Sequence, residues 1–128
     1  MRTIHLFPAA DRDTTSAALD SLALPDGSGG WKFSDLAWLR LETAGEGLYG
    51  DWPEEDVASL SAALEAVPEW AVVADLSVRA TPESLRPLLH GVLAEGGVVV
   101  DDNSAVPWSV NDIERGARQP AFIAFVRD

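Results

Sequence analysis

Apolar runs bounded by breakers alternate along this chain with segments of helical spacing, and this alternation is what most constrains its fold. The longest run, from Trp70 to Val78, contains three valines and is interrupted only by Asp75 and Ser77. Its length and its β-branched residues predict a buried strand. A carboxylate inside such a strand is costly unless it is paired, protonated or turned to a solvated face. We therefore expect Asp75 to face solvent or to pair with Arg40 or Arg79.

Residues 36–42 show a second, different pattern. Apolar and polar side chains alternate there, so that Ala37, Leu39 and Leu41 share one face and Trp38, Arg40 and Glu42 share the other. A period of two predicts a strand with one buried face.

The other elements are predicted from shorter signals. Apolar runs predict strands over residues 3–7, 98–100 and 121–126. Helical spacing predicts helices over residues 14–23, 51–67, 82–95 and 109–114. The first helix has Asp13 as its expected cap, and the second has a capping box formed by Asp51 and Glu54 with Pro53 in its first turn.

Strands and helices of this number and order predict an α/β (or α+β) fold. We expect one globular domain over residues 1–128, a sandwich with a mixed sheet of about five strands and three to four helices. The breaker-rich segment 25–30 is expected to form a flexible, glycine-rich loop.

Composition narrows the functional classes. The chain has a formal net charge of −12 and no cysteine, while 47% of its residues are hydrophobic. It is therefore expected to fold, and disulfides and thiolate chemistry are excluded. Nucleic-acid binding proteins need clustered Lys and Arg, so we predict no nucleic-acid partner. No segment approaches the ~20 apolar residues of a membrane span, and the first residues lack a signal-peptide core, so we expect a cytoplasmic protein with no membrane contact.

The strongest functional signal is a long segment in which every charged residue is acidic. Between Arg40 and Arg79 there are nine carboxylates and no basic residue, and six of the nine lie in residues 42–56. Aromatic side chains among carboxylates form a surface that a basic partner can bind. The predicted partner surface consists of Glu42, Glu46, Tyr49, Asp51, Trp52, Glu54 and Glu55.

Helix capping is the alternative explanation for these charges. Asp51 and Glu54 fit a capping box, and Glu55 and Asp56 suit the positive end of a helix dipole. In that reading, Trp52 packs the loop onto the core. Capping does not account for Glu42, Glu46 or Tyr49.

A second candidate site is a pocket near the end of the strand 98–100. Asp101, Asp102 and Asn103 follow this strand, and ligands in α/β folds collect beyond strand ends. With Asp75 they could supply the oxygen ligands of Mg²⁺ or Ca²⁺, but no spaced ligand pattern accompanies them. We therefore predict no metal and no cofactor. The pocket candidates are Asp75, His90, Asp101, Asp102 and Trp108.

No serine-nucleophile motif occurs, and neither His5 nor His90 has an identifiable orienting group, so no catalytic residue is predicted. The leading hypothesis is a small acidic soluble protein that acts by protein–protein interaction. In its concrete form it is an immunity-type neutraliser of a basic toxin or nuclease. The alternatives are an enzyme or small-molecule or metal-binding domain with the pocket described above, and a homodimeric structural subunit.

Overall fold

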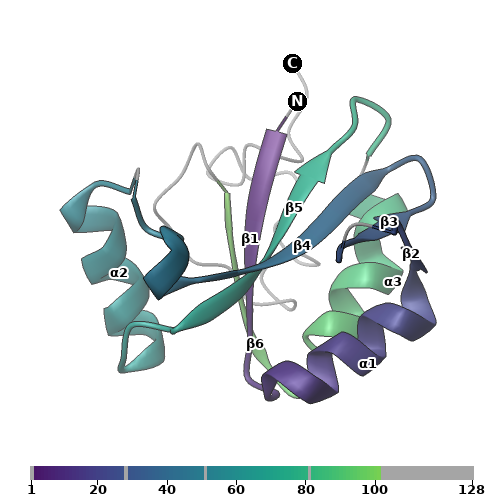
Figure 1. The fold of residues 1–128 in the computed structure, drawn as a ribbon. Coiled ribbons are helices and arrows are strands. Elements are labelled where there is room, and N and C mark those ends of the chain that lie inside the picture. Colours follow the sequence, from purple (N-terminus) through teal and green to yellow (C-terminus); the bar gives the residue numbers. More distant parts are fainter. Residues whose placement is uncertain (1, 28, 51, 81, 102–128) are drawn as a thin grey trace.

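A six-stranded sheet with three helices forms the part of the chain that the computed structural model describes, residues 2–27, 29–50, 52–80 and 82–101. The fold is α+β (Figure 1). In chain order its elements are β1 (Arg2–Pro8), α1 (Arg12–Leu22), β2 (Leu24–Pro25), β3 (Trp31–Phe33), β4 (Ala37–Thr43), the 3-10 turn η1 (Ala44–Glu46), α2 (Glu54–Leu64), β5 (Trp70–Leu76), α3 (Pro82–Val92) and β6 (Gly97–Asp101).

The strands lie in the order β2-β3-β4-β5-β1-β6. All five pairings in the described part of the chain are antiparallel, so the sheet there is not mixed as predicted. Hydrophobic periodicity locates a strand but carries no information on its direction. The connection through η1 and α2 returns the chain beside β4 in the opposite direction, which makes β5 its antiparallel neighbour.

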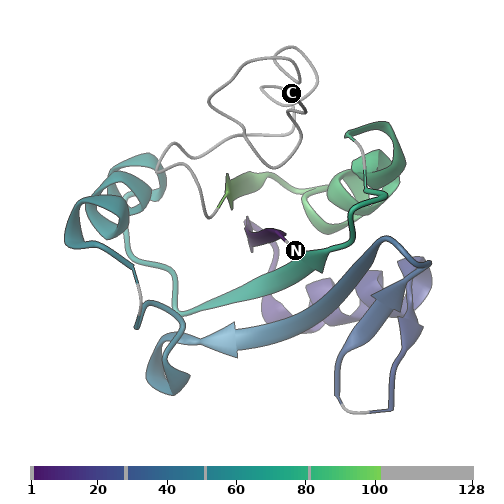
Figure 2. The same ribbon diagram turned by 90° about the horizontal axis from the view of Figure 1, so that it is seen from above.

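Helices cover both faces of the sheet. Figures 1 and 2 show α1 and α3 together on one face and α2 on the other. The core under α1 and α3 is the larger one, and its strand residues include Ile4, Leu6, Val72 and Ala74. Strands covered on both sides have few polar residues, which explains the long apolar run of β5.

The smaller core lies between the sheet and α2. Its buried residues are Phe7, Leu48, Leu60, Ala71, Val73 and Val100. Successive residues of β5 alternate between the two cores, so Val72 faces α1 and α3 whereas Val73 faces α2. The predicted sandwich of helices on a sheet is therefore confirmed.

Two helix starts differ from the prediction. Helix α1 begins at Arg12, and its cap is Asp11 rather than Asp13, because an Asp11 carboxylate oxygen accepts the Thr14 amide hydrogen bond at 2.7 Å. Helix α2 begins at Glu54 with Pro53 in the cap position and no side-chain cap bond, so the predicted capping box is wrong. Pro53 is extended (ψ 149°), so the helix begins two residues later than a cap at Asp51 would place it.

Helix α2 also ends earlier than predicted. Its last residue is Leu64, and Glu65 follows in the left-handed region at φ 65°. A left-handed residue of this kind is a common helix stop, although Gly is the usual residue there. Helix α3 similarly ends at Val92, before the left-handed Gly96 and Gly97.

Strands β2 and β3 were not predicted. They form a hairpin in which Leu24 lies opposite Lys32 and Pro25 lies opposite Trp31. The indole N–H of Trp31 donates to an Asp20 carboxylate oxygen at 2.8 Å, which ties the hairpin to α1. The loop predicted over residues 25–30 connects these strands.

Other predictions lie outside the described residues: the helix over residues 109–114 and the strand over residues 121–126. In the part of the chain that is described, no helix is both long and apolar enough to cross a membrane.

Replacement of Gly97 by Ala should destabilise the protein by about 2 kcal/mol or more. Gly97 has a φ of +122°, and an added Cβ would overlap the Phe7 carbonyl oxygen and lie 2.9 Å from the Pro8 Cα. The free energy of unfolding in urea measures the effect. Gly45→Ala is the matched control, since nothing lies within 4 Å of its Cβ position. Equal stability of the two variants would contradict the prediction.

Candidate functional site

The face of the sheet that carries α2 holds most of the predicted partner surface. Alternation places Trp38, Arg40 and Glu42 of β4 on this face, as predicted from their spacing. In the register, Asp75 lies opposite both Trp38 and Thr3, and Val73 lies opposite both Arg40 and His5. Asp75 and Thr3 therefore lie at the end of this face that is distant from Ala71, whereas Glu42 lies directly opposite Ala71.

Asp75 is the centre of a polar chain across β1, β5 and β4. The Thr3 hydroxyl donates to its Oδ1 at 2.8 Å, and Arg40 Nη1 pairs with its Oδ2 at 2.7 Å. Arg40 Nε also pairs with Glu42 at 2.5 Å. Asp75 was expected either to face solvent or to pair with Arg40 or Arg79, and the structure shows the pair with Arg40 on a side chain that is only half-buried. One guanidinium is shared by two carboxylates, so Arg40 leaves no uncompensated positive charge on this face.

Four aromatic rings form a cluster between the sheet and the loop that leads into α2. They belong to His5 and Phe7 of β1 and to Tyr49 and Trp52 of the loop. The Trp52 ring meets those of His5 and Tyr49 edge to face at 5.1 Å, and it meets Phe7 at 6.0 Å. The Tyr49 hydroxyl donates to the Pro68 carbonyl at 2.8 Å. Burial raises the pKa of Tyr49 to about 12, so this hydroxyl stays protonated and remains a donor. Tyr49 and Trp52 are half-buried, and they hold this loop and the end of α2 against the sheet.

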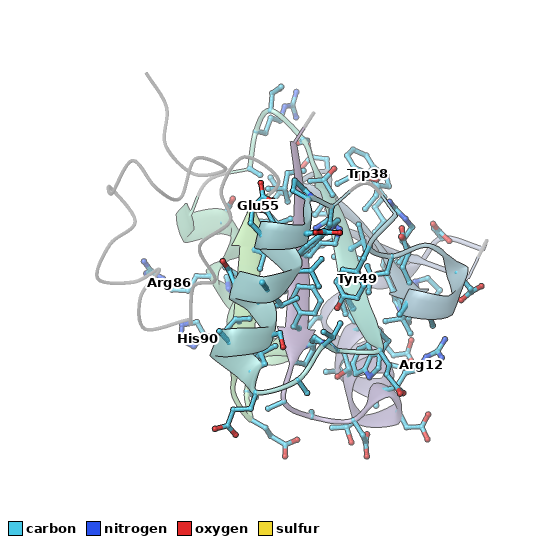
Figure 3. The ribbon with its side chains drawn as sticks, turned by 90° about the vertical axis from the view of Figure 1, so that its left-hand side faces the viewer. Arg12, Trp38, Tyr49, Glu55, Arg86 and His90 are labelled. Carbon is cyan, nitrogen blue, oxygen red and sulfur yellow. The ribbon has the colours of Figure 1, made fainter. Side chains whose placement is uncertain are left out.

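The predicted acidic residues divide into paired and unpaired groups. Glu42 pairs with Arg40, and Glu46 accepts a hydrogen bond from the Thr43 hydroxyl at 2.8 Å. Asp51 lies outside the described residues. Glu54 and Glu55 are exposed in the first turn of α2, where the helix dipole favours them. Figure 3 shows Glu55 at this end of α2 and Tyr49 inward of the helix.

Carboxylates without an ion pair in the described part of the chain lie at the two ends of α2, in its first turn and in the loop that follows it. Within the described part of the chain, ion pairs join Arg40 to two carboxylates and Arg79 to Asp35. The residues of α2 and its C-terminal loop take no part in them. The carboxylates of this segment that take part in no described ion pair are Glu54, Glu55, Asp56, Glu65 and Glu69. All except Asp56 are classed as exposed.

The second predicted pocket is not brought together by the described residues. Asp75 lies on the α2 face, whereas His90 lies exposed on α3, which covers the opposite face. Asp101 is the last residue of β6, and Asp102 and Trp108 lie outside the described part. No group of three acidic or histidine residues suited to a metal ion occurs among the residues that the structure describes.

His5, which the sequence analysis set aside as a catalytic base, packs in the aromatic cluster. Its Nδ1 atom is buried and has no hydrogen-bond partner. Burial lowers the pKa of His5 below its ordinary value of 6.5, and Arg40 acts in the same direction, while Glu42 and Asp75 oppose this. The alternation of residues 3–7 places His5 on the same face as Phe7, and this was the available signal.

A homodimer, the third alternative, would need exposed apolar side chains at its interface. The large ones in the described part are Leu24, Trp38, Val67 and Val78. They belong to β2, β4, the loop after α2 and the loop after β5. Figure 3 shows Trp38 away from α2.

No protein family, curated protein or solved structure shows a significant match to this chain. The functional argument therefore depends on the geometry and charges described above.

Tyr49→Phe should lower the free energy of unfolding by about 1 kcal/mol, the usual effect of losing one hydrogen bond. The variant removes the donor to the Pro68 carbonyl and keeps the ring in its aromatic cluster. Urea unfolding monitored by tryptophan fluorescence measures the change. A variant as stable as the wild type would show that this hydrogen bond does not hold the α2 loop.

Acidification should destabilise the wild type through His5. Because the folded-state pKa is lowered, the unfolded state binds a proton first as the pH falls through 6.5. The contribution of neutral His5 is complete above that pH and is lost below it, until the folded state also protonates. Melting temperatures at about pH 7.5 and about pH 5 measure this effect.

The control for this prediction is His5→Phe, which keeps a ring against Trp52 and removes the titration. Arg40, Glu42 and Asp75 are present in both proteins. The variant should therefore lose less stability than the wild type between the two pH values. An equal loss would assign the pH dependence to carboxylates instead.

Proposed function

We propose that this protein is an acidic binding module that acts by contact with a basic protein partner. The observation that supports the proposal is two groups of carboxylates that take part in no ion pair among the described residues: Glu54, Glu55 and Asp56 at the start of α2, and Glu65 and Glu69 after its end. The chain has no Lys, Arg or His between Arg40 and Arg79, and Arg40 is shared by Glu42 and Asp75. This side of the molecule therefore has no described cation to offset its negative charge.

The physical basis is electrostatic steering. A surface of one charge sign raises the rate of encounter with a partner of the opposite sign and disfavours partners of the same sign. The helix dipole explains why acidic residues are tolerated in the first turn of α2. It does not explain the exposed Glu65 and Glu69 at the other end, where the dipole disfavours them.

In this proposal the aromatic residues have a supporting role. Tyr49 and Trp52 pack against Phe7 and His5, so they fix the position of α2 rather than project toward a partner. The carboxylates are thereby carried on a helix whose placement is set before binding. A preformed surface loses less conformational freedom on association than a mobile one.

The concrete form of the proposal is an immunity-type neutraliser of a nuclease-type toxin in the cytoplasm. Nucleases bind phosphates with Lys and Arg, and an acidic surface presents the same type of charge as the phosphate backbone. Nucleic acid itself is repelled by a chain with a net charge of −12.

Charge reversal on α2 tests this function. The double variant Glu54→Lys/Glu55→Lys should lose at least about tenfold in affinity for the partner, since it reverses two charges of the proposed interface. Asp13→Lys/Glu95→Lys is the matched control, because it changes the net charge equally with exposed residues elsewhere. Partners are captured from lysate of the native source at low salt, and affinity is then measured by calorimetry with the purified partner.

Two outcomes would contradict the proposal. Equal losses in the two variants would show that overall charge, rather than the α2 surface, governs binding. Failure of the wild type to retain any basic protein at low salt would remove the proposed function. In the toxin form, an equimolar amount of wild-type protein should also abolish nucleic-acid cleavage by the captured partner.

A further inference from the structure

A hollow lies where the C-terminal end of α2 meets the end of the sheet. It has a volume of about 470 Å³. Leu64, Ala66 and Pro68 form the wall on the α2 side, and Pro8 and Ala9 at the end of β1 form part of the other wall. These are apolar side chains. Among the described residues that line the hollow, Glu69 is the only one with a titratable group.

Hydrogen bonds fix the backbone around the hollow. The Ala9 amide donates to the Gly96 carbonyl at 2.9 Å, and the Ala44 amide donates to the Glu69 carbonyl at 2.8 Å. The Pro68 carbonyl accepts the Tyr49 hydroxyl. The backbone of both walls is therefore held in place by hydrogen bonds. The shape of the hollow is set by this backbone as well as by its side chains.

The charge at this hollow is negative. Glu69 is exposed and its carboxylate takes part in no ion pair among the described residues. The last turn of α2 contains no basic residue, so the partial negative charge of the helix C-terminus is not compensated there. The exposed Glu65, directly after the helix, adds a second carboxylate near this end. All three features favour a cation.

The apolar walls restrict which cation fits. A metal ion needs several oxygen ligands, and the described lining supplies one carboxylate. Arginine and lysine combine a charged head with a methylene stem that packs on apolar surface. A guanidinium also binds a carboxylate through two hydrogen bonds, which an ammonium group does not.

We propose that this hollow receives an arginine side chain of the basic partner, with its stem against Leu64, Ala66 and Pro68 and its guanidinium on Glu69. This inference rests on the proposed function and names one specific contact within it. The carboxylates of α2 attract the partner, and the hollow supplies a defined position for one of its side chains. Such a contact would fix the position of the partner on this surface, which electrostatic steering alone does not do.

The probe for this site is N-acetyl-arginine methylamide, and its uncharged analogue built on citrulline is the reference. Binding to the full chain is followed by amide chemical shifts in nuclear magnetic resonance, which detects weak association. The arginine probe should shift the amides of Ala9, Leu64, Ala66 and Glu69, whereas the citrulline probe should leave them unchanged.

Two variants locate the contact. Glu69→Gln should weaken binding of the arginine probe by about tenfold, because a charge-assisted hydrogen bond is lost. Ala66→Leu should also weaken it by filling the apolar wall with no change of charge. Ala66 is exposed, so this substitution leaves the core intact. Glu95→Gln removes an exposed charge elsewhere and should bind the probe as the wild type does.

The proposal is overturned if the citrulline probe shifts the same amides equally, since the site would then be selective for shape alone. It is also overturned if the shifts are confined to Glu54 and Glu55, or if Glu69→Gln binds as the wild type does. These failures would leave the proposed function standing if Glu54→Lys/Glu55→Lys still loses the partner. Arginine binding at the hollow with no captured partner would instead support the site and remove the proposed function.

Discussion

Burial of the central strands on both faces is the constraint on which the rest of this structure depends. Strands β1 and β5 lie in the interior of the sheet, with α1 and α3 against one face and α2 against the other. Each residue of β5 from Ala71 to Ala74 is buried in one of the two cores. Because the apolar surface on both faces must be covered, three helices pack on a sheet whose pairings are all antiparallel in the described part of the chain.

This arrangement determines where charge can lie. The two cores exclude unpaired charges, so Asp75 at the end of β5 is tied to Thr3 and Arg40. Among the described helices only α2 packs on the face of the sheet that carries Asp75. Glu54, Glu55 and Asp56 lie in the first turn of α2, and Glu65 and Glu69 lie in the loop after it. The proposed binding surface is thus a consequence of how the second face of the sheet is covered.

Predictions made from sequence were most accurate where a pattern was long and regular. The alternation of Ala37, Leu39 and Leu41 with Trp38, Arg40 and Glu42 is confirmed in β4, because a period of two has one structural interpretation. Strands β2 and β3 were missed because they contain two and three residues and flank a glycine-rich loop. The cap of α1 was misplaced because Asp11 and Asp13 both precede its apolar residues, and only backbone geometry selects Asp11.

The sequence by itself determined the position of the main strands, the location of the helices and the one-signed charge between Arg40 and Arg79. These follow from local periodicity and composition, which need no knowledge of neighbouring segments. Only the tertiary structure decided that every described pairing is antiparallel, that Tyr49 and Trp52 point inward, and that Asp75 and His90 lie on opposite faces. These features depend on contacts between residues far apart in the chain. Local sequence does not determine them, because side-chain packing and strand hydrogen bonds form together when the cores form.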